Sequence, residues 1–243
     1  MADFPAAMPH GPLTEVFPDV FVVEGGFRFG PGLTIGRNMT VVRQGDELTV
    51  INSVRLTPEG EQALATLGRV VNVVRIGAFH SLDDPYFVDR YKPVLWAPPG
   101  TRHGGGLQTT RELVPGQSPL DGARVFAFEK GKRPEAAIVV GADRAGGGVL
   151  VTCDSYQNWT HYDGCSLLGG LLTRAMGFGP TLIGGPWTKQ MGPDVRLDFQ
   201  RLLDEPFSHL VPGHGSPLAD RAKEGLRTAM TNRFGVGAAG ATA

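Results

Sequence analysis

The chain has 243 residues, and its 24 Asp and Glu residues against 23 Lys and Arg residues give a net charge of −1. A chain of this length can bury a full hydrophobic core without disulfides or structural metal ions. Its near-neutral charge creates no long-range field that would attract phosphate backbones or anionic membrane surfaces, so we expect neither nucleic acid nor a membrane as a partner.

The composition is that of a turn-rich globular protein. The 35 Gly and 19 Pro residues predict many tight turns between short strands. Two cysteines, Cys153 and Cys165, are too few for a disulfide framework and fit no zinc-finger spacing, so we interpret them as free thiols in a reducing compartment. The N-terminal segment lacks the basic and apolar regions of a signal peptide, and no apolar run reaches the roughly 18 residues that cross a bilayer. We therefore expect a cytoplasmic protein.

The first half of the sequence predicts mainly strands. Apolar runs favour strands at 16–23, 39–43 and 48–51, of which the last two form a hairpin. A helix is predicted at 58–67, because Thr57 is suited to cap it and Pro58 takes its first position. A nearly continuous β-branched run predicts a strand covered on both faces. It is followed by a short helix and another buried strand, and these three elements lie at 70–76, 85–91 and 94–97.

The second half predicts three more strands and then helices. A loop at 101–122 leads to strands at 125–128, 136–140 and 149–152, which are followed by helices at 167–176, 195–203 and 218–234. Ser166 is predicted to cap the first of these helices. The order of elements predicts two mixed sheets with helices on their outer faces. We expect one domain over residues 1–235 and a flexible tail at 236–243.

Three polar side chains follow predicted strands and are candidates for a functional site. His80 comes after the buried run at 70–76, Asp154 directly after the strand at 149–152, and His214 after an apolar tripeptide. Loops at the carboxyl ends of strands are where α/β proteins usually place their sites. Each residue alone is a weak indication, because His and Asp at strand ends often only cap a neighbouring helix or turn.

The segments around these residues resemble the metallo-β-lactamase-fold superfamily. The resemblance is carried by the PGHG segment around His214, by GGGVLVTCDS ending near Asp154, and by His80 followed by Asp84. It implies a four-layer αββα sandwich of two mixed β-sheets flanked by helices, with the site at one edge of the sheets.

The sequence departs from the family's H-x-H-x-D-H motif. Laid over residues 80–85, the motif keeps His80 and Asp84 but has Leu82 and Pro85 at the positions of the second and last histidines. The family also supplies a histidine ahead of the bridging aspartate, whereas residues 129–131 here are Glu, Lys and Gly. The chain therefore resembles a divergent member with an incomplete ligand set.

The resemblance implies at most one metal ion. Asp84, Asp154 and His214 would suffice to hold one zinc, iron or manganese ion, with His80 nearby as a further ligand or as an acid–base group. His80 and Asp84 are accordingly the candidate catalytic residues. The implied activity is metal-dependent hydrolysis of a small-molecule substrate that the sequence does not identify.

Three alternatives remain open at the level of sequence. A metal-free, non-catalytic homologue would bind a small molecule or a protein at the same sheet edge, with Asp84 hydrogen-bonded to His214 and His80 bonded to a backbone carbonyl. An interaction module would use the loop at 101–122. In a third alternative, His161, Asp163 or Cys165 replaces a missing ligand; otherwise His161 is a solvated loop residue. His103 lies beside flexible glycines near the same edge, as a ligand contact or as a surface histidine.

Overall fold

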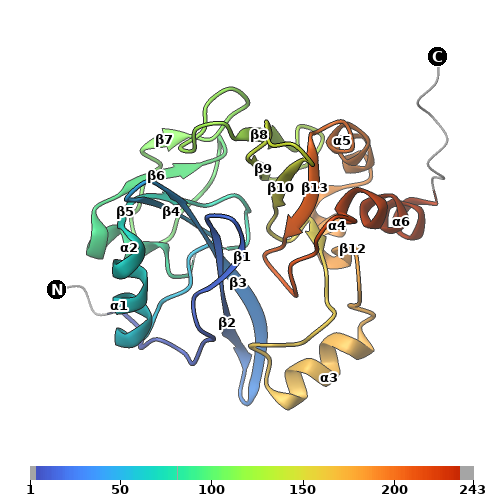
Figure 1. Ribbon diagram of the computed structural model, residues 1–243. Coiled ribbons are helices and arrows are strands. Elements are labelled where there is room, and N and C mark those ends of the chain that lie inside the picture. Colours follow the sequence, from blue (N-terminus) through green and yellow to red (C-terminus); the bar gives the residue numbers. More distant parts are fainter. Residues whose placement is uncertain (1–3, 81, 236–243) are drawn as a thin grey trace.

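Two mixed β-sheets form the centre of the computed structural model, which describes residues 4–80 and 82–235 (Figure 1). The first sheet has the strand order β1-β2-β3-β4-β5-β6-β7. Its strands are antiparallel from β1 to β4 and parallel from β4 to β7. Their bounds are β1 Thr14–Phe17, β2 Val20–Gly30, β3 Leu33–Gln44, β4 Glu47–Ile51, β5 Arg69–Val74, β6 Val94–Ala97 and β7 Arg111–Glu112.

The second sheet is smaller and has the order β13-β10-β9-β8. Strand β10 pairs in parallel with β13 and antiparallel with β9, which in turn is antiparallel to β8. A short two-stranded ribbon joins β11 to β12. The bounds are β8 Arg124–Ala127, β9 Ala136–Val140, β10 Gly148–Val151, β11 Tyr156–Gln157, β12 Leu182–Ile183 and β13 Phe207–Val211.

Helices cover the outer faces of both sheets. Two of them, α1 Pro58–Leu67 and α2 Asp84–Tyr91, lie on the first sheet, and α4 Gly185–Met191, α5 Val195–Leu202 and α6 Ala222–Phe234 lie on the second (Figure 1). The remaining helix, α3 Leu167–Ala175, contacts β3 at the long β2–β3 ribbon. Both predicted helix caps are confirmed, since the side chains of Thr57 and Ser166 accept hydrogen bonds from Gly60 N and Gly169 N.

Alternation along the strands explains why both faces of each sheet are buried. In β2, Val20 and Val22 face the second sheet, whereas Phe21 and Val23 pack with the helices α1 and α2. Because successive side chains of a strand point to opposite faces, an unbroken apolar run supplies two layers of core at once. The structure is thus a four-layer αββα sandwich, and this prediction is confirmed.

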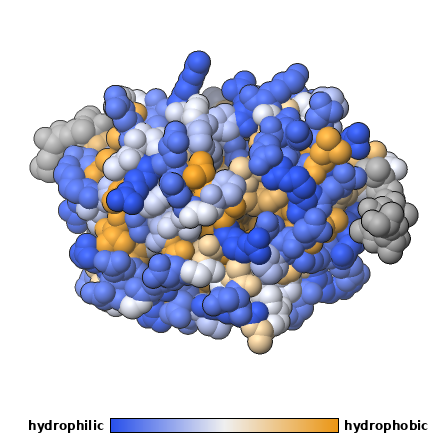
Figure 2. Space-filling view, turned by 90° about the horizontal axis from the view of Figure 1, so that it is seen from above, coloured by the Kyte–Doolittle hydropathy of each residue, from blue (hydrophilic) through white to orange (hydrophobic). Residues whose placement is uncertain are grey.

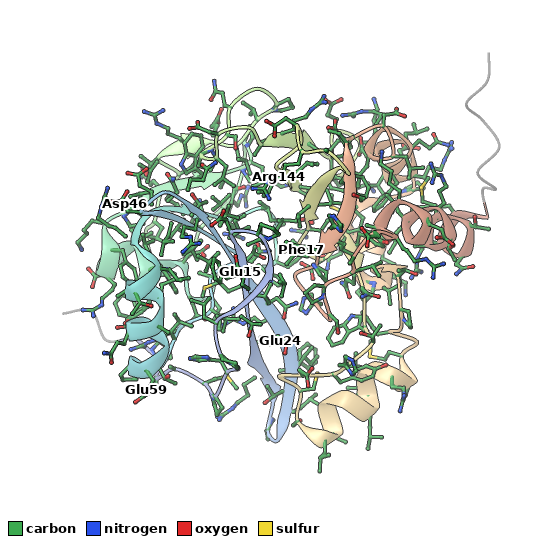
Figure 3. All side chains as sticks on the ribbon, viewed as in Figure 1. Glu15, Phe17, Glu24, Asp46, Glu59 and Arg144 are labelled. Carbon is green, nitrogen blue, oxygen red and sulfur yellow. The ribbon has the colours of Figure 1, made fainter. Side chains whose placement is uncertain are left out.

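Contacts at one end of the sandwich join the two sheets. The ring of Phe17 on β1 lies 4.7 Å from the ring of His209 on β13, centre to centre. Arg144, in the turn after β9, donates a hydrogen bond of 3.3 Å to the carbonyl of Pro18 (Figure 3). The antiparallel strands β1 and β2 at the start of the chain are therefore attached to the second sheet.

The structure corrects three details of the predicted elements. The strand at 16–23 is two strands, because Asp19 turns the chain with φ of 62°. The closing helix starts at Ala222 rather than 218, since Leu218 exchanges backbone hydrogen bonds with Leu210. Strand β13, helix α4 and the two-residue strands β7, β11 and β12 were not predicted, and β7 lies within the predicted loop at 101–122. The remaining predicted elements lie within one or two residues of the observed ones, except that the hairpin strand at 39–43 is the end of the longer β3.

The surface seen from above is largely hydrophilic, with small scattered apolar groups (Figure 2). Within the described residues, no helix combines the length and the apolar character needed to span a bilayer. The predicted tail at 236–243 lies outside the described residues.

The aromatic cluster behind the second sheet gives a test of the core. Phe199 is fully buried, and its ring lies 5.4 Å from that of Phe128 and 5.7 Å from that of Trp187. Phe199→Ala removes this packing and leaves a cavity, so we expect the free energy of unfolding to fall by about 3–5 kcal/mol in urea denaturation. Leu167→Ala, at a side chain that is 92% exposed, is the control and should change it by less than about 0.5 kcal/mol. Equal effects of the two substitutions would contradict this packing.

Candidate metal centre

The loop after β5 carries His80, and a buried arginine holds this loop in place. Arg75 donates hydrogen bonds to the carbonyls of Gly77 and Ala78, at 3.0 and 2.6 Å. Gly77 also lies against Cys153, where any added Cβ would clash with the thiol. The loop therefore has a fixed path, and it brings the imidazole of His80 to the edge where β10 ends.

Asp154 and His214 come from the two parallel strands of the second sheet. Asp154 follows β10, and His214 follows β13 in the PGHG segment. Gly215 has φ of 82°, and a Cβ there would clash with the carbonyl of Asn158, so only glycine fits beside His214. Because β10 and β13 run in parallel, their carboxyl ends deliver both side chains to the same edge.

The ring of His214 is held in a defined orientation. Its Nδ1 lies 2.6 Å from the carbonyl oxygen of Gly36 on β3, to which it donates a hydrogen bond. Trp159 stacks on the ring at 5.7 Å between centroids, with 17° between the planes. In the neutral imidazole, the proton on Nδ1 leaves the lone pair on Nε2. His214 therefore presents an electron-pair donor to the site.

Three side chains with metal-binding donor atoms meet at this edge of the sandwich. His80 Nε2 lies 2.9 Å from His214 Nε2, and Asp154 places one carboxylate oxygen 3.2 Å from His214 Nε2 and the other 3.6 Å from His80 Nε2. The side chains of His80 and His214 are each 9% exposed and that of Asp154 is 17% exposed. We call His80, Asp154 and His214 the site triad. The structure thus brings together three of the four predicted ligands.

The protonation states of His80 and Asp154 suit metal binding. Burial lowers the pKa of His80, and although Asp154 opposes this effect, the imidazole stays neutral at pH 7. Burial alone would raise the pKa of Asp154, but His80 and His214 hold it well below its usual range, so the carboxylate is ionised. A metal ion needs neutral imidazoles and ionised carboxylates as ligands.

Asp84, the fourth predicted ligand, has a different hydrogen-bond partner. Its Oδ1 accepts a hydrogen bond of 2.6 Å from the hydroxyl of Ser53, and its Oδ2 is buried with no hydrogen-bond partner among the described residues. Burial raises its pKa to about 6 despite Ser53 and Arg75, which lower it. A hydrogen bond from Asp84 to His214 is not observed, since His214 bonds to Gly36 and His80 instead. As a metal ligand or catalytic group, Asp84 stays a prediction.

The other two candidate histidines lie outside the triad. His103 Nε2 is 2.9 Å from the hydroxyl of Thr109. His161 is exposed in the segment before α3. In the same segment, the thiol of Cys165 accepts a hydrogen bond from Gly36 N at 3.1 Å, so this stretch supports β3 from outside.

Cys153 lies at the site, which the sequence analysis missed by treating both cysteines alike. It is fully buried, and its Sγ is 3.3 Å from Asp154 Oδ2. His80, Cys153 and Asp154 offer donor atoms that all lie within 4.8 Å of one another. Its place in the sequence could have indicated this, because Cys153 directly precedes Asp154 at the end of a buried strand.

Glu135 was missed as well. This residue is 2% exposed and pairs with Gly77 in an isolated β-bridge. Burial and the nearby Asp154 raise its pKa well above the usual value, which favours the neutral carboxylic acid. Its position just before β9 gave no indication of burial beside the site.

Comparison with known proteins shows similarity in structure without similarity in sequence. No family model matches the chain, and no curated protein matches it. The structure of VMB-1 at pH 5.5 is 14% identical, with a TM-score of 0.66 over 93% of this chain and 99% of that one. The metallo-β-lactamase FIM-1 from Pseudomonas aeruginosa, in its mono-zinc form, is 12% identical, with a TM-score of 0.66 over 94% and 97%. A metallo-β-lactamase from Hirschia baltica is 10% identical, with a TM-score of 0.63 over 91% and 98%.

The buried carboxyl group of Asp84 predicts a pH-dependent stability. Because its folded-state pKa of about 6 lies above the unfolded value, the native state binds the proton more tightly and loses stability as the pH rises between these two values. Compared with Asp84→Asn, which cannot ionise, the wild type should therefore lose about 2 kcal/mol between pH 4 and pH 7. Urea denaturation at a series of pH values, with chelator present, measures this difference.

The control for this pH series is Asp46→Asn. Asp46 is exposed in the turn between β3 and β4, so this substitution reports on the loss of a surface carboxylate (Figure 3). If the difference in free energy of unfolding between wild type and Asp84→Asn does not change with pH, the pKa of Asp84 is not raised by burial and the prediction is wrong.

Proposed function

We propose that this chain, which shares the metallo-β-lactamase fold over nearly its whole length, is a hydrolase that holds one metal ion at the site triad. The observation that carries the proposal is the convergence of His80 Nε2, His214 Nε2 and the Asp154 carboxylate, with 2.9–3.6 Å between neighbouring donor atoms. Two imidazoles and one carboxylate are three ligands, the number that leaves a position open for water or substrate at a catalytic metal.

The residues present fit such an ion. Two imidazole nitrogens face each other, His214 is fixed by Gly36 so that its lone pair points into the site, and the carboxylate between them is ionised. This donor set suits zinc, iron(II) or manganese. The thiol of Cys153 lies 3.3 Å from Asp154 Oδ2, but burial and the neighbouring Asp154 and Glu135 raise its pKa well above the usual value, so we do not count it among the ligands.

A bound metal ion would supply an activated water at neutral pH and polarise the bond to be broken. The contribution of the chain itself is to orient the metal ligands. Gly36 and Trp159 fix the plane of the His214 ring, and Arg75 fixes the backbone before His80. Asp84 is retained as a proposed further ligand or acid–base group, because its Oδ2 is buried without a partner among the described residues. We expect a small-molecule substrate with an ester, thioester, lactam or phosphodiester bond.

The same geometry supports one alternative, a metal-free homologue that binds a small molecule or protein at this edge. If His214 carries its proton on Nδ1, then His80 carries one on Nε2 and donates it to His214 Nε2 at 2.9 Å. This hydrogen bond satisfies both rings without an ion. The two functions therefore differ in metal content and in hydrolytic activity.

Metal analysis separates these alternatives. Protein purified without chelators, or incubated with zinc, iron(II) or manganese and then desalted, should contain about one equivalent of metal. His214→Ala and Asp154→Asn each remove a ligand and should lower this below about one-tenth of an equivalent. His161→Ala is the control, and it should keep the full content. Absence of metal after all three incubations would establish the metal-free alternative.

Hydrolysis is tested with chromogenic substrates of the four bond types. We expect turnover of at least one of them, loss of activity on treatment with a chelator, and recovery when the metal is returned. His214→Ala should reduce kcat/KM by at least about 100-fold, because the activated water is lost with the metal. A protein that binds the ion but hydrolyses none of the four would contradict the enzymatic part of the proposal.

A further inference from the structure

A cavity lies beside the loop that carries His80, and it is lined by positive charges. It has a volume of about 530 Å³, and its lining includes four cationic residues, Arg75, Arg102, Lys132 and Arg133. Among the described residues that line it there is no Asp or Glu. We call it the cationic cavity. A hollow lined by charges of one sign concentrates the electric field and raises the local concentration of oppositely charged ligands.

Three of the four cations of this cavity form no ion pair with the residues that the structure describes. Among the ion pairs formed by the described residues, none involves the side chain of Arg102, Lys132 or Arg133. The contact of Arg133 is with the face of the Phe79 ring, 5.6 Å from its centre. Three guanidinium or ammonium groups are therefore free to bind an anion.

Another cavity of the same protein shows the contrast. It has a volume of about 450 Å³ and is also lined by two arginines, Arg124 and Arg201. There, however, Arg124 pairs with Glu205 at 3.2 Å and Arg201 with Glu129 at 2.9 Å, and both carboxylates belong to the same lining. The arginines of this cavity are thus neutralised by carboxylates in its own lining, whereas the lining of the cationic cavity supplies none.

Arg75 gives the cationic cavity a rigid wall. It is 3% exposed, and its guanidinium donates to the carbonyls of Gly77, Ala78 and Arg102. These bonds use three of the five N–H groups of an arginine and leave two. The carboxyl groups that act on its charge, Asp84 and Glu135, are buried and outside the cavity lining. Arg75 is thus a fixed cation beside three exposed ones.

We propose that the cationic cavity binds the phosphoryl group of a small molecule. A phosphate monoester carries a charge of about −1.5 to −2 at pH 7 and has three acceptor oxygens, whereas a carboxylate offers one charge and two oxygens. The forked guanidinium groups match phosphate oxygens bidentately. Thr101 and Gln190 in the same lining add polar side chains. This site does not depend on the metal proposal, because none of the triad lines it.

Titration calorimetry in a buffer free of phosphate tests the proposal, with chelator-treated protein so that the site triad holds no ion. The probes are inorganic phosphate, pyrophosphate, phenyl phosphate and succinate. We expect saturable one-to-one binding of the phosphate probes that weakens as potassium chloride is raised. Tighter binding of phenyl phosphate than of inorganic phosphate identifies a phosphorylated organic molecule as the ligand, and the reverse order identifies the free ion.

Matched variants locate the binding. Arg102→Ala with Arg133→Ala should weaken phosphate binding by at least about tenfold, because each removes a charged hydrogen bond. The control is Arg28→Ala with Arg227→Ala, which removes the same charge from exposed positions outside the cavity and should leave binding within about twofold. His214→Ala should also bind phosphate normally, whether or not the protein binds metal. Binding of succinate as tight as that of phosphate, equal loss in both double variants, or no saturable binding would overturn the proposal.

Discussion

The hydrogen bond from His214 Nδ1 to the carbonyl of Gly36 joins the two ends of the chain at the site. Its partners are 178 positions apart in sequence. Asn38, two residues further along β3, supports the same junction by donating from its side chain to the carbonyl of Pro212, 3.0 Å away. The orientation of His214 and the closure of the two sheets are consequently one constraint, because the first sheet must dock on the second before the imidazole can turn its lone pair inward.

Much of the fold follows from local sequence patterns. The β-branched run at 70–76 predicted a strand buried on both faces, and Thr57 and Ser166 predicted where two helices begin. What local patterns missed depends on distant partners. Strand β13 contains the polar pair Ser208 and His209 and is a strand because β10 lies beside it, and Leu218 joins a β-bridge instead of a helix because Leu210 faces it. Such pairings are set by tertiary context rather than by propensity.

The site was only partly predictable for a similar reason. His80, Asp154 and His214 follow apolar strands, so their arrival at one edge could be inferred from the topology that the resemblance implied. Cys153, Glu135 and Arg75 are buried just beyond the ends of strands β10, β9 and β5. A shift of one residue in register would turn such a side chain to the opposite face, so the sequence did not show which of them face the site. The sequence motif placed Asp84 among the ligands, but the fold hydrogen-bonds it to Ser53.

The helix α3 has a weaker attachment than the rest of the structure. Only Gly169 and Thr173 are buried in it, while Leu167, Leu168 and Leu171 are each more than half exposed. Little apolar surface is therefore buried when α3 packs on β3, and detaching this helix requires less free energy than unfolding the sandwich. Its backbone amides should consequently exchange with solvent long before those of β9 and β10, so that this one segment reports local breathing while the two sheets stay intact.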